Sequence, residues 1–143
     1  MEKNYEMLRL GNQLCFPLYA CSREIVKKYN PLLAELGITY TQYIVMLVMW
    51  EERRISVKEL GAKLYLDSGT LTPVLKSLAA KGFVTRERSA EDERVLIIEL
   101  TAEGEALKER AVEIPPKIGC CVQLTGDEAV ELHRLLYKVL GGM

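Results

Sequence analysis

The sequence has little or none of several features that would assign it to other classes of protein. Its single histidine, His133, stands among apolar residues, so we expect a structural histidine and no zinc site. No apolar run approaches the roughly 20 residues that a membrane-spanning helix needs. Residues 1–5 lack the basic and apolar regions of a signal peptide. We therefore expect a cytoplasmic protein with no membrane association, no metal and no other cofactor.

Repeats, linkers and low-complexity segments are also missing, so 143 residues fit one domain with a real core. Apolar residues make up 49% of the chain and charged residues 27%, as in an ordinary globular protein. In the cytoplasm the four cysteines are expected to be free thiols rather than structural disulfides.

The charge is unevenly distributed along the chain. The net charge is only −1, which argues against a protein that coats nucleic acid indiscriminately. Residues 53–88, however, carry eight cations against three anions, a local charge of +5. A basic middle between acidic ends is typical of a DNA-reading face on an otherwise neutral protein, although any single cation here could be merely solvated.

Residues 67–82 are predicted to form one short helix around which the rest of the chain is organised. Asp67 or Ser68 can cap it, Gly82 can close it, and Pro73 should be tolerated only in its first turn. Apolar residues recur at spacings of three and four, while the opposite face carries hydroxyls and lysines: Ser68, Thr70, Thr72, Lys76 and Lys81. Such a helix has the profile of one that reads the major groove of DNA.

Two strand-like runs follow, at residues 83–88 and 95–100, separated by a charged tip at 89–94. A helix-turn-helix that continues into such a hairpin is a winged helix, in which the wing reaches a neighbouring backbone or minor groove. We therefore take double-stranded DNA as the partner, at an inverted-repeat operator. The candidate DNA contacts are Ser68, Thr70, Thr72, Pro73, Lys76, Arg86, Arg88, Asp92 and Arg94.

Helices flank this unit on both sides. Residues 7–29 form an amphipathic helix in which Pro17 should cause a bend after Cys15, and Asn30-Pro31 should end it before a short helix at 32–36. The nearly all-apolar segment 39–51 is predicted to be the buried centre of the fold.

A capping box at Ser56 opens the first helix of the helix-turn-helix, which ends near Leu64. Another helix runs from Thr101 to about Val112, until Pro115-Pro116 ends or kinks it, and a last helix begins after Thr125. The sequence thus predicts a mostly α (α+β) winged helix. Because its terminal helices have wide apolar stripes and no further layer to cover them, we expect a homodimer.

Motifs spread over nearly the whole chain resemble the MarR family of dimeric repressors, and more narrowly its organic-hydroperoxide-sensing OhrR-type branch. The residues that carry the resemblance are Asn12-Gln13-Leu14-Cys15-Phe16, Thr39-Tyr40, the segment 64–73, Asp92-Glu93-Arg94 and the segment 100–104. The resemblance implies one MarR-like domain over 1–143, with a DNA-binding winged helix at 38–101 and dimerisation helices at 5–36 and 102–143.

The same resemblance implies a redox sensor. Cys15 would be the peroxide-reactive thiol, Tyr19, Tyr29 and Tyr40 would surround it across the dimer, and its oxidation by an organic hydroperoxide would release DNA. Cys120 stands where two-cysteine members keep a resolving cysteine. From the residues alone, Cys15 could instead be a small core residue and Cys120 a buried helix cysteine, and Cys21 is expected to be inert packing.

Three other functions are considered beside the sensor. A MarR-type repressor that responds to a small phenolic ligand is the main alternative. A thiol peroxidase has thin support because no second catalytic group stands beside Cys15, so we expect no enzyme. A sensor of arsenic or another thiophilic metal through Cys120-Cys121 is chemically possible.

Overall fold

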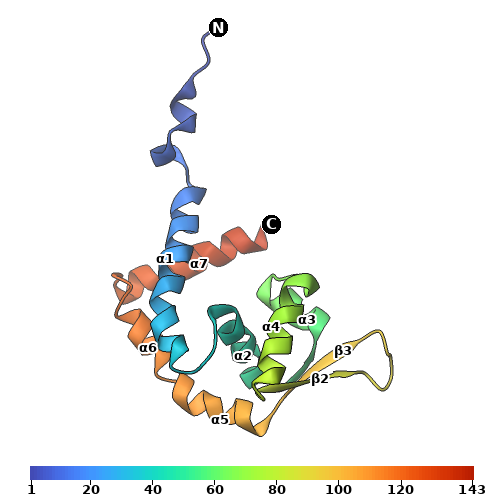
Figure 1. The fold of residues 1–143 in the computed structure, drawn as a ribbon. Coiled ribbons are helices and arrows are strands. Elements are labelled where there is room, and N and C mark those ends of the chain that lie inside the picture. Colours follow the sequence, from blue (N-terminus) through green and yellow to red (C-terminus); the bar gives the residue numbers. More distant parts are fainter.

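The computed structural model describes residues 1–143 and is mostly helical, with one small sheet (Figure 1). Its elements in chain order are two short 3-10 turns (Tyr5–Leu8 and Leu10–Asn12), α1 (Cys15–Ala34), α2 (Tyr40–Glu52), β1 (Arg54–Ser56), α3 (Val57–Leu64), α4 (Ser68–Ala80), β2 (Val84–Arg88), β3 (Leu96–Leu100), α5 (Ala102–Ala111), α6 (Ile114–Gly119) and α7 (Gly126–Gly141). This arrangement confirms the predicted α+β winged helix. None of the helices has the length and apolar character to cross a membrane.

The N-terminal helix differs from the prediction at both prolines. The chain turns before Cys15, and α1 begins there, so Pro17 falls in the first turn and causes no bend. Amide groups in a first turn have no partner inside the helix, so proline costs little there. The expected end at Asn30-Pro31 is wrong, because α1 continues through Pro31 to Ala34. Leu33, just beyond it, is fully buried in the core, and this packing outweighs one lost hydrogen bond at an exposed turn.

The buried centre of the fold is α2, as the sequence predicts. Thr39 and Gln42 form a reciprocal capping box at its start, and seven of its residues are buried. The sheet beside it has the strand order β1-β3-β2 with both pairings antiparallel. The wing strands β2 and β3 pair from Val84 opposite Leu100 to Arg88 opposite Leu96. Strand β1 was not predicted, since three residues are too few to show an alternating pattern.

The helix-turn-helix consists of α3 and α4. Ser56 caps α3 and Asp67 caps α4, whose Thr70 amide donates to the Asp67 carboxylate at 2.7 Å. Pro73 is the sixth residue of α4, so the expectation that it lies in the first turn is wrong. The helix tolerates it because Gly69, whose carbonyl loses its partner, is exposed to water. Gly82, at a φ of +84°, ends the segment as predicted.

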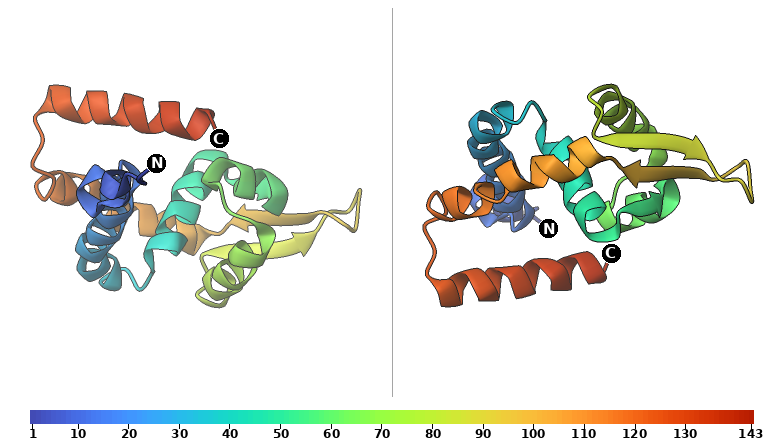
Figure 2. Two further views of the ribbon diagram at one scale, coloured as in Figure 1. Left: turned by 90° about the horizontal axis from the view of Figure 1, so that it is seen from above. Right: turned by 90° about the horizontal axis from the view of Figure 1, so that it is seen from below.

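The C-terminal helices form an arm beside this unit. The proline pair lies in the first turn of α6, after α5 has ended at Ala111. Helix α7 begins with the predicted capping box of Thr125 and Glu128, and no residue of it is buried. Figure 2 shows α7 as a separate rod joined to α6 by a loop. His133 is exposed and stacks on Tyr137 with ring centres 4.7 Å apart.

Candidate nucleic-acid interface and thiol site

A cleft of about 1060 Å³ opens between the helix-turn-helix and the wing. Helix α4 lines one side with Ser68, Thr72 and Lys76, and the wing lines the other with Arg86, Arg88 and Arg94. Six of the nine predicted DNA contacts therefore converge on one cation-rich concavity, whereas Thr70, Pro73 and Asp92 lie outside its lining. Lys58 and Tyr65 also line it and were missed by the sequence analysis, because neither stands in the predicted reading helix or wing.

The tight turn between α3 and α4 sets the angle of the reading helix. Tyr65 takes the left-handed conformation at a φ of 57°. A Cβ atom on Gly61 would come within 2.5 Å of the Leu66 carbonyl oxygen, so only glycine permits this approach. Hydrogen bonds from Thr70 hold the pKa of Asp67 below its ordinary value, which keeps the capping carboxylate charged.

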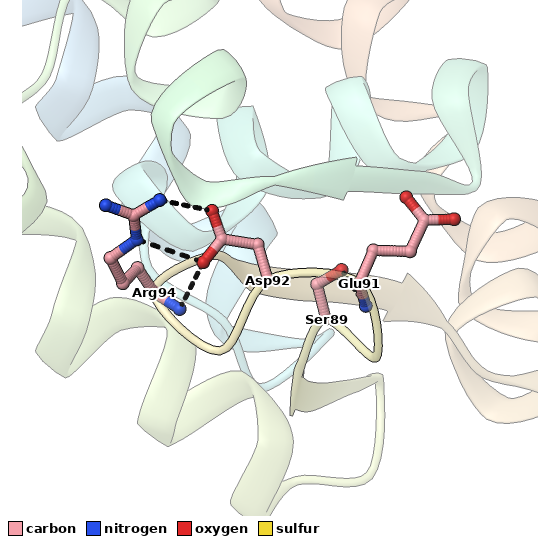
Figure 3. Close-up of polar contacts among 4 residues, drawn as sticks. All are labelled: Ser89, Glu91, Asp92 and Arg94. Carbon is pink, nitrogen blue, oxygen red and sulfur yellow. Dashed lines mark hydrogen bonds and ion pairs between the residues drawn. The ribbon is translucent and has the colours of Figure 1, made fainter.

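The wing tip presents a guanidinium held in place by a neighbouring carboxylate (Figure 3). Arg94 donates through Nε to Asp92 Oδ1 at 3.1 Å and through Nη2 to Oδ2 at 3.2 Å. Its backbone amide donates to the same Oδ1 at 3.0 Å. The Arg94 side chain remains 89% exposed, and these bonds lower the pKa of Asp92. Asp92 therefore acts as a clamp that aims Arg94 outward.

A polar joint ties the start of α2 to the reading helix. Gln42 is only 5% exposed, and its Nε2 donates to Ser77 Oγ of α4 at 2.9 Å. Lys81 Nζ donates to Gln42 Oε1 at 2.9 Å and to the Gly37 carbonyl at 2.6 Å. Because Gln42 also caps α2, a displacement at the start of α2 bears on the end of α4.

Two of the predicted sensor tyrosines pack together next to this joint. The ring centres of Tyr29 and Tyr40 lie 4.9 Å apart, and Tyr43 lies 5.7 Å from Tyr29 and 6.2 Å from Tyr40. Burial raises the pKa of each phenol above its ordinary value, so all three stay neutral and can donate hydrogen bonds. Tyr43 was missed as a member of this cluster, since its position in α2 indicated only core packing.

The predicted thiol does not lie in this cluster within one chain. Cys15 is exposed at the start of α1, and the 14 residues of helix that separate it from Tyr29 span about 21 Å. Tyr19, one turn after Cys15, is also exposed, and its hydroxyl accepts from Arg23 Nη1 at 3.3 Å. The thiol of one chain can therefore meet Tyr29 and Tyr40 only of another chain.

The remaining cysteines are exposed within the chain as well, so neither Cys21 nor Cys120 is buried by its own chain. Cys120 directly follows α6. Cys21 and Cys121 share a small hollow between α1 and α6, and Cys120 is not part of its lining.

Comparisons with known proteins agree on a transcriptional regulator. The family model described as "Transcriptional regulator SarA/Rot" matches residues 27–111. The chain is 49% identical over 140 residues to the organic hydroperoxide resistance transcriptional regulator of Bacillus subtilis, covering 98% of this chain and 95% of that one.

Solved structures extend the likeness to DNA-bound proteins. The structure of reduced AbfR bound to DNA has a TM-score of 0.82 at 39% identity over 96% of this chain and 94% of that one; AbfR is a protein of Staphylococcus epidermidis. The disulfide form of AbfR has a lower TM-score of 0.65 at 40% identity over 96% and 93% of the two chains. A mutant MarR from E. coli complexed with operator DNA has a TM-score of 0.81 at 28% identity over 98% and 99%. The present arrangement thus lies nearer the reduced, DNA-bound form of AbfR than its disulfide form.

Proposed function

This chain belongs to the MarR family of winged-helix transcriptional regulators, in its OhrR-type branch, and on that premise we propose that it represses transcription until an organic hydroperoxide oxidises Cys15. It is a DNA-binding regulator rather than an enzyme. The hydroperoxide part of the proposal draws on the name of the Bacillus relative, and the thiol part on the disulfide and overoxidised forms known for AbfR.

The observation that carries the DNA-binding role is the cation-lined cleft. In the proposed complex, Ser68, Thr70, Thr72 and Pro73 of α4 enter the major groove, with Lys76 toward the backbone. Arg94, aimed outward by Asp92, reaches the neighbouring minor groove, while Arg86 and Arg88 lie beside phosphates. The winged helix at 38–101 is the proposed DNA-binding part of the domain.

The proposed repressor is a homodimer on an inverted repeat. Its dimerisation helices are assigned to 5–36 and 102–143 because these segments hold most of the exposed large apolar side chains, including Leu10, Leu14, Val130, Leu132, Leu135, Leu136 and Val139. A twofold mate is the simplest cover for such surfaces, and it places two copies of α4 against two half-sites about one helical turn apart.

The same twofold arrangement completes the proposed sensor. Cys15 of one chain approaches Tyr29 and Tyr40 of its mate, whose neutral phenols donate to the sulfur and favour the thiolate. Tyr19 flanks the thiol from its own helix. The thiolate attacks the terminal peroxide oxygen and the O–O bond breaks, so Cys15 becomes a sulfenic acid. The leaving alkoxide takes up the proton that the thiol released on ionising and departs as an alcohol.

Cys120 of the mate is the proposed resolving thiol. Its sulfur attacks the sulfenic sulfur of Cys15, water leaves, and an intersubunit disulfide forms. Such a bond needs Cα atoms about 5.5 Å apart. If the two thiols start farther apart, the C-terminal arm moves to close the gap, and the proline pair and Gly119 at the two ends of α6 are where it can bend. That movement would respace the two reading helices and release DNA.

Operator binding by reduced protein tests the proposal. Cumene hydroperoxide should release the wild type and leave Cys15→Ser bound, with Cys21→Ser as the matched control that still responds. A Cys15→Ser protein released by hydroperoxide would disprove the sensor role. Release by a phenolic acid in both proteins, with no effect of hydroperoxide, would establish the ligand-responsive alternative.

A further inference from the structure

A second pair of thiols lies away from the proposed sensor, in the groove between α1 and α6. The hollow there has a volume of about 140 Å³ and is lined by Cys21, Glu24, Ile25, Lys28, Ile118, Cys121 and Val122. Both cysteines are exposed. Neither Cys15 nor Cys120 is among the lining residues, so this hollow involves different thiols from those of the proposed sensor.

The direction of the two helices places these thiols opposite each other. Near the end of α5, Arg110 Nη2 donates to the Glu35 carbonyl at 2.6 Å, so the chain enters α6 beside the C-terminal end of α1. Helix α6 then runs back along α1, as Figure 1 shows. In this antiparallel arrangement Cys121, just beyond the end of α6, lines the same hollow as Cys21, the lining residue nearest the start of α1.

Helical geometry explains why Cys121 is selected rather than Cys120. The lining residues of α1 are spaced by three, four and seven positions, which puts Cys21, Glu24, Ile25 and Lys28 on one face. On the other side Ile118 and Cys121 are three residues apart, so they share a face of α6 and its following turn. Cys120 is rotated by about 100° from Cys121 and points elsewhere.

The surroundings of the pair favour thiol chemistry. Lys28 forms no ion pair, whereas Glu24 is engaged by Lys27 at 3.1 Å, so the hollow has one cation without an ion-pair partner. Cys121 Sγ lies 3.5 Å from the Lys117 carbonyl and sits in a turn after α6. Because Cys121 lies in this turn, its backbone can shift toward α1 without unwinding a helix.

We propose that Cys21 and Cys121 of the same chain form an intrachain disulfide when the protein meets an organic hydroperoxide. One thiolate attacks a peroxide oxygen, the O–O bond breaks, and an alcohol leaves. The other thiol then attacks the resulting sulfenic acid and displaces water, so two thiols and one hydroperoxide give one disulfide, one alcohol and one water.

This bond would have a regulatory consequence. It fixes the end of α6 to α1 and thereby holds Cys120, the next residue, away from the Cys15 of the mate. The intrachain bond and the intersubunit bond would then compete. Only this competition rests on the proposed function; the formation of the intrachain bond does not.

The test uses Cys15→Ser/Cys120→Ser, which keeps only the two thiols of the hollow. After a slight excess of cumene hydroperoxide, maleimide labelling should fall from two thiols per chain to none, and the protein should run as a monomer on a non-reducing gel. Trypsin should then release residues 10–23 and 118–134 joined by one disulfide. Adding Cys21→Ser is the control, because it should abolish this linked peptide.

Two outcomes would overturn the proposal. One is the survival of both thiols under oxidant that fully oxidises Cys15 in the wild type, and the other is a covalent dimer in place of the linked peptide. The competition is tested separately with Cys121→Ser, which should give a larger yield of covalent Cys15–Cys120 dimer than the wild type. An unchanged yield would show that the two disulfides do not compete. If Cys15→Ser fails to block DNA release, that result counts against the proposed sensor and leaves the intrachain disulfide unaffected.

Discussion

The two helices α4 and α7 carry similar apolar stripes, but only the stripe of α4 is buried within the chain. Leu71, Leu75 and Leu78 of α4 are fully buried under their own chain. The corresponding stripe of α7 remains exposed, and every buried residue of the molecule lies between Leu33 and Ile118. The comparison separates a winged helix whose core is complete within one chain from terminal helices whose exposed stripes are covered, we propose, by a second chain.

The largest effect is expected from substitutions in the exposed apolar stripe of α7. Leu132→Glu/Leu136→Glu places two charges in the α7 stripe, so the protein should become a monomer. Loss of two-site binding should weaken operator affinity by roughly 10²- to 10⁴-fold. Sedimentation equilibrium and fluorescence anisotropy on DNA selected from a random pool measure both changes. Lys138→Glu is the control, and a double variant that stays dimeric would contradict the assignment of α7 to the interface.

The two stripes should also differ in how their stability depends on concentration. Leu75→Ala should lower the free energy of unfolding by about 2–5 kcal/mol at any protein concentration, because its cavity lies inside one chain. The loss in free energy of unfolding caused by Leu136→Ala should instead depend on protein concentration, because the proposed partner subunit covers this side chain. Urea denaturation at two concentrations distinguishes them. If the loss of stability depends on concentration equally in both variants, the α4 stripe and the α7 stripe do not differ in which chain buries them.

Within the winged helix, a substitution at the Gln42 joint is expected to have the next largest effect. Gln42→Leu removes the bonds to Ser77 and Lys81 and leaves both groups short of partners, which should cost about 1–3 kcal/mol of stability. DNA affinity should fall with it because α4 loses its anchor. Ser77→Ala is the matched variant that breaks only one of the bonds. If Gln42→Leu and Ser77→Ala prove equally mild in urea denaturation, the joint does not position α4.

The exposed wing tip should give a smaller and more selective effect. Arg94→Ala should lower the slope of log affinity against log salt by about one for each wing, because a cation in the groove is lost, with no change in folding. Arg94→Lys should restore most of that slope, whereas Asp92→Asn should keep the charge and lose only its fixed direction. Titrations at several salt concentrations provide the measurement. An unchanged slope in Arg94→Ala would remove the wing from the interface.

The smallest equilibrium effect is expected at the tyrosine cluster, where the two halves meet. Tyr40→Phe should leave operator binding intact and slow the oxidation of Cys15, because one hydrogen-bond donor to the thiolate is lost. Stopped-flow oxidation compares it with Tyr137→Phe, an exposed control. An oxidation rate equal to that of the wild type would exclude Tyr40 from the sensor.

The cluster also makes a prediction about pH. Burial raises the pKa values of Tyr29, Tyr40 and Tyr43 in the folded protein, so their contribution to stability is complete below the ordinary pKa of about 10. It is lost as pH rises through the raised values, since the unfolded chain then releases protons more readily. Tyr43→Phe should reduce this alkaline loss of stability in urea denaturation.

Local signals in the sequence determined much of this protein. The caps at Asp67 and Thr125, the apolar run of residues 39–51 and the helical and strand periodicities predicted α2, α4, α7 and both wing strands, because capping bonds and amphipathic faces join residues only a few positions apart. The cationic reading helix and wing followed from composition in the same way. The family resemblance added the sensor assignment, which spacing alone left open.

The tertiary structure decided what depends on residues far apart in the chain. Helix α1 continues through Pro31 because Leu33 is buried by distant segments, and β1 exists because β3 pairs with it. Tyr43 packs against the proposed sensor tyrosines Tyr29 and Tyr40, and Cys21 and Cys121 line one hollow, because packed helices bring together side chains that sequence separation gives no reason to pair. Local hydrogen bonds select the elements, but only packing between them determines which side chains meet.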